Sequence, residues 1–154
     1  MNRITYFEGK FEFMSNFFPS VVFLDGDSYP TVENAYQAAK TLNCQIRWRM
    51  QNMQPGGAKR LGNSLQLRPD WESVKYEIMK DLVSQKFIQL PFKVKLLETG
   101  DSQLIEGNSW HDQIWGACNC GGSLGFCKKK PTTVASNWLG KILMEVRKVL
   151  QNAN

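Results

Sequence analysis

The sequence lacks the long apolar runs and the nucleotide or metalloprotease motifs that would assign it to a class at once. No stretch approaches the roughly 18 apolar residues that a membrane-spanning helix needs, and the opening residues MNRITYFEGKFEF hold no apolar signal-peptide segment. We therefore expect a cytoplasmic protein with no membrane partner. P-loop, GxGxxG and HExxH sequences do not occur either.

The sequence has few cysteines, four in 154 residues, and a cytoplasmic protein keeps such thiols reduced. Cys118 and Cys120 form a C-x-C pair, Cys127 follows, and Cys44 is distant. Structural zinc prefers cysteine pairs with two to four residues between them. The spacing therefore favours loop or buried thiols, and we expect no metal. A zinc-dependent module that uses the cysteines is the rival hypothesis.

The composition is that of an ordinary globular protein. Hydrophobic residues make up 42% and charged residues 21% of the 154 positions, which suits a single domain over residues 1–154. The formal net charge of +5 suits a ligand that carries phosphates, and also nucleic acid. Basic residues are spread along the chain except at Lys128–Lys130, so a nucleic-acid partner is an open alternative.

The hydrophobic pattern predicts a helix-dominated α+β fold with a small sheet contributed largely by the N-terminal part. Strands are expected near residues 20–24 and 104–106, and a loop over residues 116–133. Thr31 can cap the first helix. Helices are expected over Val32–Leu42, Ile46–Met53, Ala58–Leu61, Trp71–Ile88, Pro91–Thr99 and from Trp138 onward, the last with a stripe of Trp138, Ile142, Leu143, Val146, Val149 and Leu150.

One face of the first predicted helix carries four polar or aromatic side chains. Glu33, Tyr36, Gln37 and Lys40 follow the spacing i, i+3, i+4, i+7, which places them on the same side of a helix. Small alanines occupy much of the remaining surface. The face could form part of a site, or it could be an ordinary solvated stripe.

A second cluster surrounds the only histidine. The run Trp110–Gly116 contains His111, one carboxylate and two tryptophans, and Glu106 lies just upstream. A carboxylate beside tryptophan can act as a general acid or base, and tryptophan can stack on a flat heterocycle. The alternative is a Trp-rich corner of the core in which Asp112 caps a turn.

Two further segments could bind a substrate. Ser15 and Asn16, between aromatic residues in Phe13–Phe17, can hydrogen-bond a sugar or a heterocycle, or simply form a turn. The glycine-rich run Gly121–Gly125 could present backbone N–H groups to a phosphate. The candidate cations for such a phosphate are Lys59, Arg60 and Lys128.

Taken in order, these segments resemble one family across nearly the full length. The chain is similar to the YbiA-like proteins, also called the NADAR family for their association with NAD and ADP-ribose metabolism. The segments that carry the resemblance are Phe13–Phe17, Tyr29–Lys40, Ala58–Gly62, Asp70–Trp71, Met79–Phe87, Leu96–Asp101, Leu104–Glu106, Asp112–Gly116 and Asn137–Arg147. The loop with Cys118, Cys120, Cys127 and Lys128–Lys130 departs from the pattern.

The resemblance implies a mostly helical α+β domain that hydrolyses an N-glycosidic bond at a ribose C1, without metal or organic cofactor. It implies two substrate classes. One is ADP-ribosylated guanine in nucleic acid or nucleotides, from which ADP-ribose is removed. The other is a phosphorylated ribosylamino-pyrimidine intermediate of riboflavin biosynthesis. A non-catalytic ADP-ribose-binding module is the rival from another class.

We assign roles to individual residues on this basis. Glu33 would stabilise positive charge at C1, and Lys40 would attack C1 to form a Schiff base, as the resemblance suggests. Asp112 is preferred over His111 as the general acid or base because it falls on the family motif. The substrate-binding candidates are Ser15, Asn16, Phe17, Tyr36, Gln37, Arg60, Trp71, Glu106, Trp110, Trp115 and Gly116.

Overall fold

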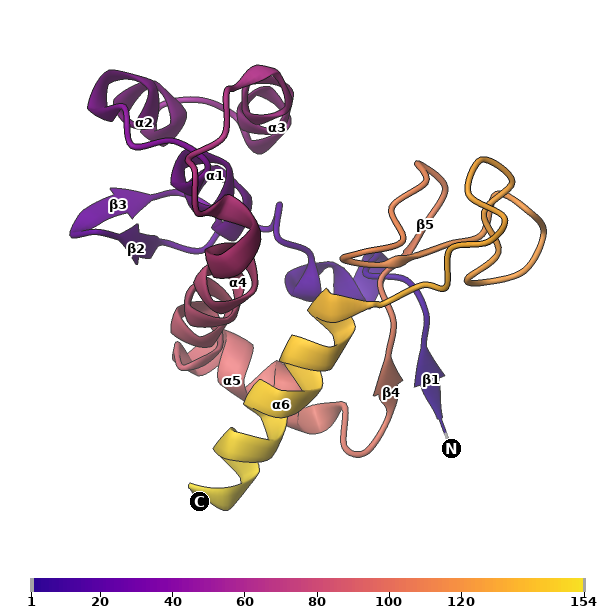
Figure 1. The fold of residues 1–154 in the computed structure, drawn as a ribbon. Helices are drawn as coiled ribbons and strands as arrows, with labels where there is room; N and C mark the ends of the chain where they lie inside the picture. The colour runs from indigo at the N-terminus through magenta and orange to yellow at the C-terminus, as the bar shows by residue number, and fades with distance from the viewer. Residues whose placement is uncertain (1, 154) are drawn as a thin grey trace. The chain divides into compact units, whose positions relative to one another are not determined.

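The computed structural model describes residues 2–153, which divide into two compact units (Figure 1). The central unit comprises Ser15–Gln89. The terminal unit comprises the residues up to Met14 together with those from Leu90 onward. None of the helices in the described residues combines the length and the hydrophobicity that crossing a membrane requires.

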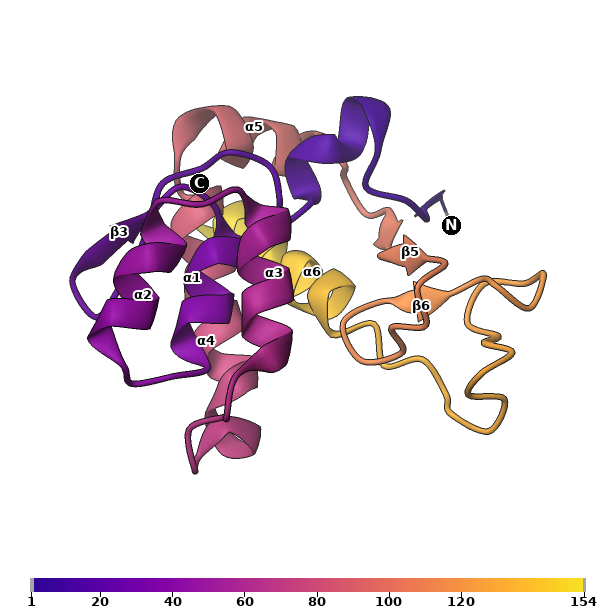
Figure 2. The ribbon, with the colours of Figure 1, turned by 90° about the horizontal axis from the view of Figure 1, so that it is seen from above.

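The central unit is assembled around its first helix, α1. Its elements are β2 (Val22–Leu24), β3 (Asp27–Tyr29), α1 (Val32–Ala39), α2 (Cys44–Gln51), α3 (Pro55–Ser64) and α4 (Trp71–Phe87). The antiparallel pair β2–β3 turns through Asp25 and Gly26, both at positive φ, as a tight two-residue hairpin requires. The helix α1 packs against α2, α3 and α4 (Figures 1 and 2).

Side-chain caps set the local geometry around α1. The Oγ1 atom of Thr31 accepts a hydrogen bond from the backbone N–H of Asn34 at 3.0 Å, as an N-cap should. The Nδ2 atom of Asn34 donates to the carbonyls of Met50 and Met53, at 2.8 and 2.7 Å. The buried Asn34 amide thereby joins the beginning of α1 to the end of α2.

The terminal unit combines two short parallel ladders with two helices. Its elements are β1 (Arg3–Ile4), a 3₁₀ helix (Gly9–Met14), α5 (Leu90–Glu98), β4 (Gln103–Leu104), β5 (Gly107–Asn108), β6 (Ala117–Cys118) and α6 (Trp138–Asn152). The strand β1 pairs with β4, and β5 pairs with β6 in the register Gly107 with Ala117 and Asn108 with Cys118.

The helix α6 docks closely on β4. Leu139, Ile142 and Leu143 are buried, and a Cβ at Gly140 would collide with the carbonyl of Leu104. Asn137 precedes the helix in the left-handed region and donates from Nδ2 to that same Leu104 carbonyl at 2.9 Å. The close approach of α6 to β4 therefore depends on glycine at position 140.

The helix-dominated α+β fold is confirmed, whereas the predicted sheet and several boundaries differ. The expected small, largely N-terminal sheet is replaced by three two-stranded ladders, of which two use strands after residue 100. Pairs of two-residue strands, distant in sequence, leave no periodic signal. Val149, predicted on the apolar stripe of α6, is 67% exposed because the buried face turns away from it. One domain over residues 1–154 stays a prediction.

Candidate functional site

The helix α1 is buried along its whole length, including its polar side chains. The side chains predicted to share a face leave little surface to solvent: Glu33 is 7% exposed, Tyr36 5% and Gln37 4%. A buried carboxylate and a buried amide are costly unless they are hydrogen-bonded. The solvated-stripe alternative for this face is therefore wrong, and its polar groups need a structural or functional reason.

Glu33 and Gln37 form a hydrogen-bonded pair. The Nε2 atom of Gln37 donates to Oε1 of Glu33 at 2.8 Å, across one helical turn. The Oε1 atom of Gln37 is buried and has no hydrogen-bond partner among the described residues. A Cβ at Gly62 of α3 would collide with that amide, so α3 approaches closely only because residue 62 is glycine. The Gln37 side chain is thus fixed by its hydrogen bond to Glu33 and by the close packing of α3 at Gly62.

Aromatic rings flank the next turn of the same face. The ring of Tyr36 lies 5.2 Å from the buried ring of Trp71, at the start of α4, with a tilt of 53°. The Nζ atom of Lys40 lies 5.8 Å from the centroid of the Tyr36 ring. Three of the residues named from sequence, Tyr36, Lys40 and Trp71, therefore lie together in the central unit.

The amine of Lys40 is half-buried, and its pKa is lowered. Burial is the main cause, and the nearby positive charges of Lys59 and Lys75 lower the pKa further, while Glu33 acts in the opposite direction. A lowered pKa increases the fraction of neutral amine near pH 7, which is the nucleophilic form. The three lysines also make this region electropositive, which favours a phosphorylated ligand.

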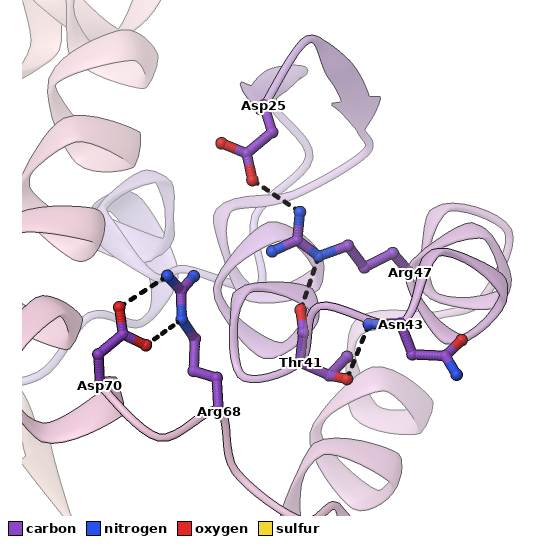
Figure 3. Close-up of polar contacts among 6 residues, drawn as sticks. All are labelled: Asp25, Thr41, Asn43, Arg47, Arg68 and Asp70. Atoms are coloured by element: carbon purple, nitrogen blue, oxygen red, sulfur yellow. Dashed lines mark hydrogen bonds and ion pairs between the residues drawn. The ribbon is translucent and has the colours of Figure 1, made fainter.

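The backbone just after Lys40 is fixed by two arginines (Figure 3). The Nε atom of Arg47 donates to the carbonyl of Thr41 at 2.7 Å, and its Nη1 atom donates to Oδ2 of Asp25 at 2.6 Å. Arg68 donates from its backbone N–H to the carbonyl of Lys40 at 2.8 Å. The guanidinium of Arg68 is held by two hydrogen bonds to Asp70 (Figure 3). The base of the Lys40 side chain is therefore anchored.

The segment Ser15–Phe17 supports α1 through its backbone. The carbonyl of Asn16 accepts the N–H of Glu33 at 3.0 Å, and Nδ2 of Asn16 contacts the sulfur of Met79 at 3.4 Å. Oγ of Ser15 accepts the N–H of Phe17, the turn geometry that was the alternative interpretation. The ring of Phe17 is 40% exposed and lies 5.7 Å from Nζ of Lys59. On α3, Arg60 is exposed.

Lys86 was not singled out from sequence, although it is the most buried charged side chain beside this segment. It is 1% exposed, and its Nζ atom donates to the carbonyl of Ser15 at 2.8 Å. Burial lowers the pKa of Lys86 to about 7. A signal was present: Lys86 stands at i+4 from Leu82 and i+3 from Val83, on the apolar face of the predicted helix.

The remaining predicted residues lie in the terminal unit. Oδ1 of Asp112 accepts the backbone N–H groups of Ile114 and Trp115, both at 2.9 Å, and the N–H of Asp112 donates to Asn108. Asp112 therefore does cap a turn, with a structural role whatever its chemistry. The other four differ in exposure: Trp110 is exposed, Glu106 and Trp115 are half-buried, and Gly116 is buried.

These five residues lie between β4 and α6, in a segment whose backbone is organised by the buried side-chain amide of Gln113. Gln113 is 1% exposed; its Nε2 atom donates to the carbonyls of Gly125 and Thr133, and its Oε1 atom accepts the N–H of Cys118. The ring of Trp115 packs edge-on against Trp138, at 5.4 Å between centroids. A Cβ at Gly116 would collide with the carbonyl of Glu106.

Comparisons with known proteins agree on one family. A family model described as the NADAR domain matches residues 6–151. An N-glycosidase of Nostoc punctiforme is 35% identical over 145 residues, covering 90% of this chain and 85% of its own length. The N-glycosidase YbiA of Escherichia coli K12 is 34% identical over 140 residues, covering 88% and 79%.

A longer relative and a solved structure extend the comparison. A riboflavin biosynthesis protein of Vibrio vulnificus is 33% identical over 143 residues, covering 90% of this chain but 35% of its own length, so the chain spans about a third of that protein. The NMR structure of E. coli YbiA superposes with a TM-score of 0.78 at 29% identity, over 99% of this chain and 88% of that one. The chain therefore belongs to the NADAR domain family.

Proposed function

We propose that this chain hydrolyses the C1–N bond of a phosphorylated ribose and removes ADP-ribose from ADP-ribosylated guanine. The coarser class, a hydrolase of N-glycosyl bonds, is the one that its Nostoc and E. coli relatives carry in their names. The observation that carries the proposal is the buried Glu33–Gln37 pair, one turn from a half-buried Lys40 whose pKa is lowered.

The chemistry needs positive charge at C1 to be stabilised while the base departs. A carboxylate held at a fixed place, as Glu33 is by Gln37, performs that task without reorganising. When the ribose ring opens, its ring oxygen takes a proton and the neutral amine of Lys40 adds to C1. The C1–N bond to the base then breaks, the base leaves with the proton that the amine gives up, and a Schiff base remains. Water then adds to C1 and releases the sugar and the free lysine.

The substrate's phosphates have a matching environment in the central unit. Lys59 and Lys75 lie close enough to Lys40 to lower its pKa, so several positive charges gather there. The net charge of +5 adds long-range attraction for a diphosphate, or for modified nucleic acid as the larger substrate. Phe17, exposed and close to Lys59, offers a ring on which a base can stack.

A second candidate substrate is supported by names among the relatives. Proteins of Vibrio vulnificus and Zea mays that match this chain are riboflavin biosynthesis proteins. The corresponding substrate is a ribosylamino-pyrimidine phosphate, which also joins a phosphorylated ribose to a flat heterocycle. The same residues would serve it, so the two candidates are separated by turnover and not by site geometry.

The test compares both substrates side by side. Release of base from ADP-ribosylated guanosine and from the riboflavin intermediate is followed for the unchanged protein, Lys40→Ala, Glu33→Ala and the control Lys148→Ala. Lys148 lies exposed on α6. We expect Lys40→Ala and Glu33→Ala to lose at least about 100-fold in kcat/KM, and Lys148→Ala to lose nothing.

Two further outcomes separate the alternatives. Borohydride added during turnover should reduce the Schiff base and leave the sugar covalently on Lys40, identified by mass. Binding of ADP-ribose seen as a thermal shift, without release of base from either substrate, would identify a binding module instead. Full activity of both Lys40→Ala and Glu33→Ala would refute the assignment of the site.

A further inference from the structure

Four metal-binding side chains converge within the terminal unit. They are His111 in the connection between β5 and β6, Cys118 at the end of β6, Cys120 just after it, and Cys127 beyond the glycine-rich turn. The Nδ1 atom of His111 and the three Sγ atoms all lie within 4.8 Å of one another. Cys118 and Cys127 are buried, so the cluster is not a chance gathering of surface groups.

The distances fit the edges of one coordination tetrahedron. With Zn–S near 2.3 Å and Zn–N near 2.0 Å, a tetrahedral site has edges of about 3.8 Å between sulfurs and about 3.5 Å between nitrogen and sulfur. The Sγ atoms of Cys120 and Cys127 lie 3.8 Å apart. The Nδ1 atom of His111 lies 3.4, 3.4 and 3.9 Å from Cys120, Cys127 and Cys118. We propose that His111, Cys118, Cys120 and Cys127 bind a structural zinc ion.

The surrounding backbone is built as a metal-thiolate site usually is. The N–H of Cys120 donates to Sγ of Cys118 at 3.4 Å, and the N–H of Lys128 donates to Sγ of Cys120 at 3.2 Å. Such bonds to sulfur stabilise a ligating thiolate. Nζ of Lys130 donates to the carbonyl of His111 at 2.8 Å, and its charge offsets part of the negative charge of three thiolates around Zn²⁺.

Chain pairing explains why the spacing concealed the site. The parallel ladder sets Asn108 beside Cys118, which returns the connection carrying His111 onto the first cysteine. Gly122 and Gly125, both at positive φ, then fold the chain back so that Cys127 meets Cys120. The ligands therefore come from a non-local pairing and a tight turn, and not from two C-x₂-C knuckles.

The ligand set indicates the kind of metal and its role. Three thiolates and one imidazole in a tetrahedron suit Zn²⁺. Four protein ligands fill the tetrahedron and leave no position for a reactive water, so the ion would hold the loop and not catalyse. Because Nδ1 binds the metal, Nε2 carries the ring proton. The proposal does not depend on the N-glycosidase activity.

The first test measures metal in the full chain purified under reducing conditions, with zinc supplied. We expect about one zinc ion per chain. Reaction of the native protein with a thiol reagent should then be confined to the exposed Cys44 and rise to all four cysteines after a chelator. Replacement of zinc by Co²⁺ should give the intense visible bands of a tetrahedral site and the near-ultraviolet absorption of sulfur-to-cobalt charge transfer.

Variants connect the metal to the four ligands. Cys118→Ser and Cys127→Ser should bind less than about a tenth as much zinc as the unchanged protein. Cys44→Ser, a thiol outside the cluster, is the matched control and should keep all of it. His111→Cys supplies a fourth thiolate, so it should keep the zinc and shift the cobalt spectrum, a result that a misfolded protein would not give.

Several results would overturn the proposal. Zinc below about a tenth of an equivalent with no cobalt bands would exclude the site. A Cys120–Cys127 disulfide that persists in reducing buffer would mean that these two thiols are close because they form a disulfide and not because they bind a metal. An absorption spectrum of bound iron would overturn the assignment to zinc. Full retention of zinc by both single variants, Cys118→Ser and Cys127→Ser, would overturn the ligand assignment.

Discussion

Replacing Gly62 by alanine tests whether the Glu33–Gln37 pair must be held in place. The added Cβ would collide with the Gln37 amide oxygen and lie 2.8 Å from Cδ and 3.1 Å from Cβ of that residue. Overpacking of a buried contact costs about 1–3 kcal/mol. Alanine in a helix recovers about 1 kcal/mol relative to glycine. The free energy of unfolding should therefore fall by only about 0–2 kcal/mol.

Activity should fall by more than this small loss of stability suggests. The Gln37 side chain must shift, and it then releases Oε1 of Glu33, which it contacts at 2.8 Å. Misplacement of a reacting group by about 1 Å can cost about 100-fold in rate, so we expect kcat/KM of Gly62→Ala to fall by about 10–100-fold. Urea unfolding and base release, measured on the same preparation, give the two quantities.

Gly57→Ala is the matched control in the same helix. Its Cβ would lie 3.8 Å from Cε of Met53, an ordinary contact, so stability should rise by up to about 1 kcal/mol with activity unchanged. Adding Gln37→Ala to Gly62→Ala should relieve the collision but should not restore activity, because Glu33 then lacks the amide that positions it. A Gly62→Ala protein with the activity of the unchanged chain would refute the reasoning, because the amide would then have no positioning role.

Three further predictions concern titratable groups. The pKa of Lys86 is about 7 in the folded chain and near 10.5 when unfolded, so the unfolded state binds more protons between these pH values. The free energy of unfolding should therefore rise with pH by up to about 1.4 kcal/mol per pH unit in this range. Urea unfolding at pH 7 and 9 should show a smaller rise in Lys86→Met than in the unchanged protein. Asp112→Asn keeps an oxygen for the two backbone N–H groups, so it should be as stable to urea as the unchanged protein but should lose activity if Asp112 transfers a proton. Asp112→Ala should lose both stability and activity. A fully active Asp112→Asn would mean that Asp112 has only a structural role. If Lys40 attacks as the neutral amine, kcat/KM should rise with pH below the usual lysine range. Lys75→Met should move that rise to higher pH, because the charge of Lys75 lowers the pKa of Lys40; an unmoved profile would contradict the coupling.

The sequence predicted the start of α1 and the side chains that share one of its faces well, because both depend on residues that are close together in the chain. Thr31 caps the helix as expected, and the i, i+3, i+4 spacing does place Glu33 and Gln37 in contact. The helix ends at Ala39 and not at Leu42, because the carbonyl of Lys40 accepts the N–H of Arg68, a residue far along the chain. No local pattern contains that bond.

Burial and long-range pairing account for what sequence reasoning could not supply. A polar stripe looks the same in the sequence whether it faces water or other helices, so only the burial of Glu33, Tyr36 and Gln37 in the folded chain excludes the solvated alternative. The convergence of His111 with the cysteines depends on the β5–β6 ladder, whose strands are two residues each. Strands so short carry no periodicity, and their parallel pairing is invisible until the chain is folded.

The hydrogen bonds of Gln113 divide the long segment before α6 into closed loops. Because the amide fixes the backbone at Cys118, Gly125 and Thr133, each intervening stretch has its ends held together. Lengthening a closed loop is inexpensive, about 0.6 kcal/mol for each doubling. Insertions between these anchor points that still let Cys127 meet Cys120 should therefore leave the strands and the helix on either side undisturbed.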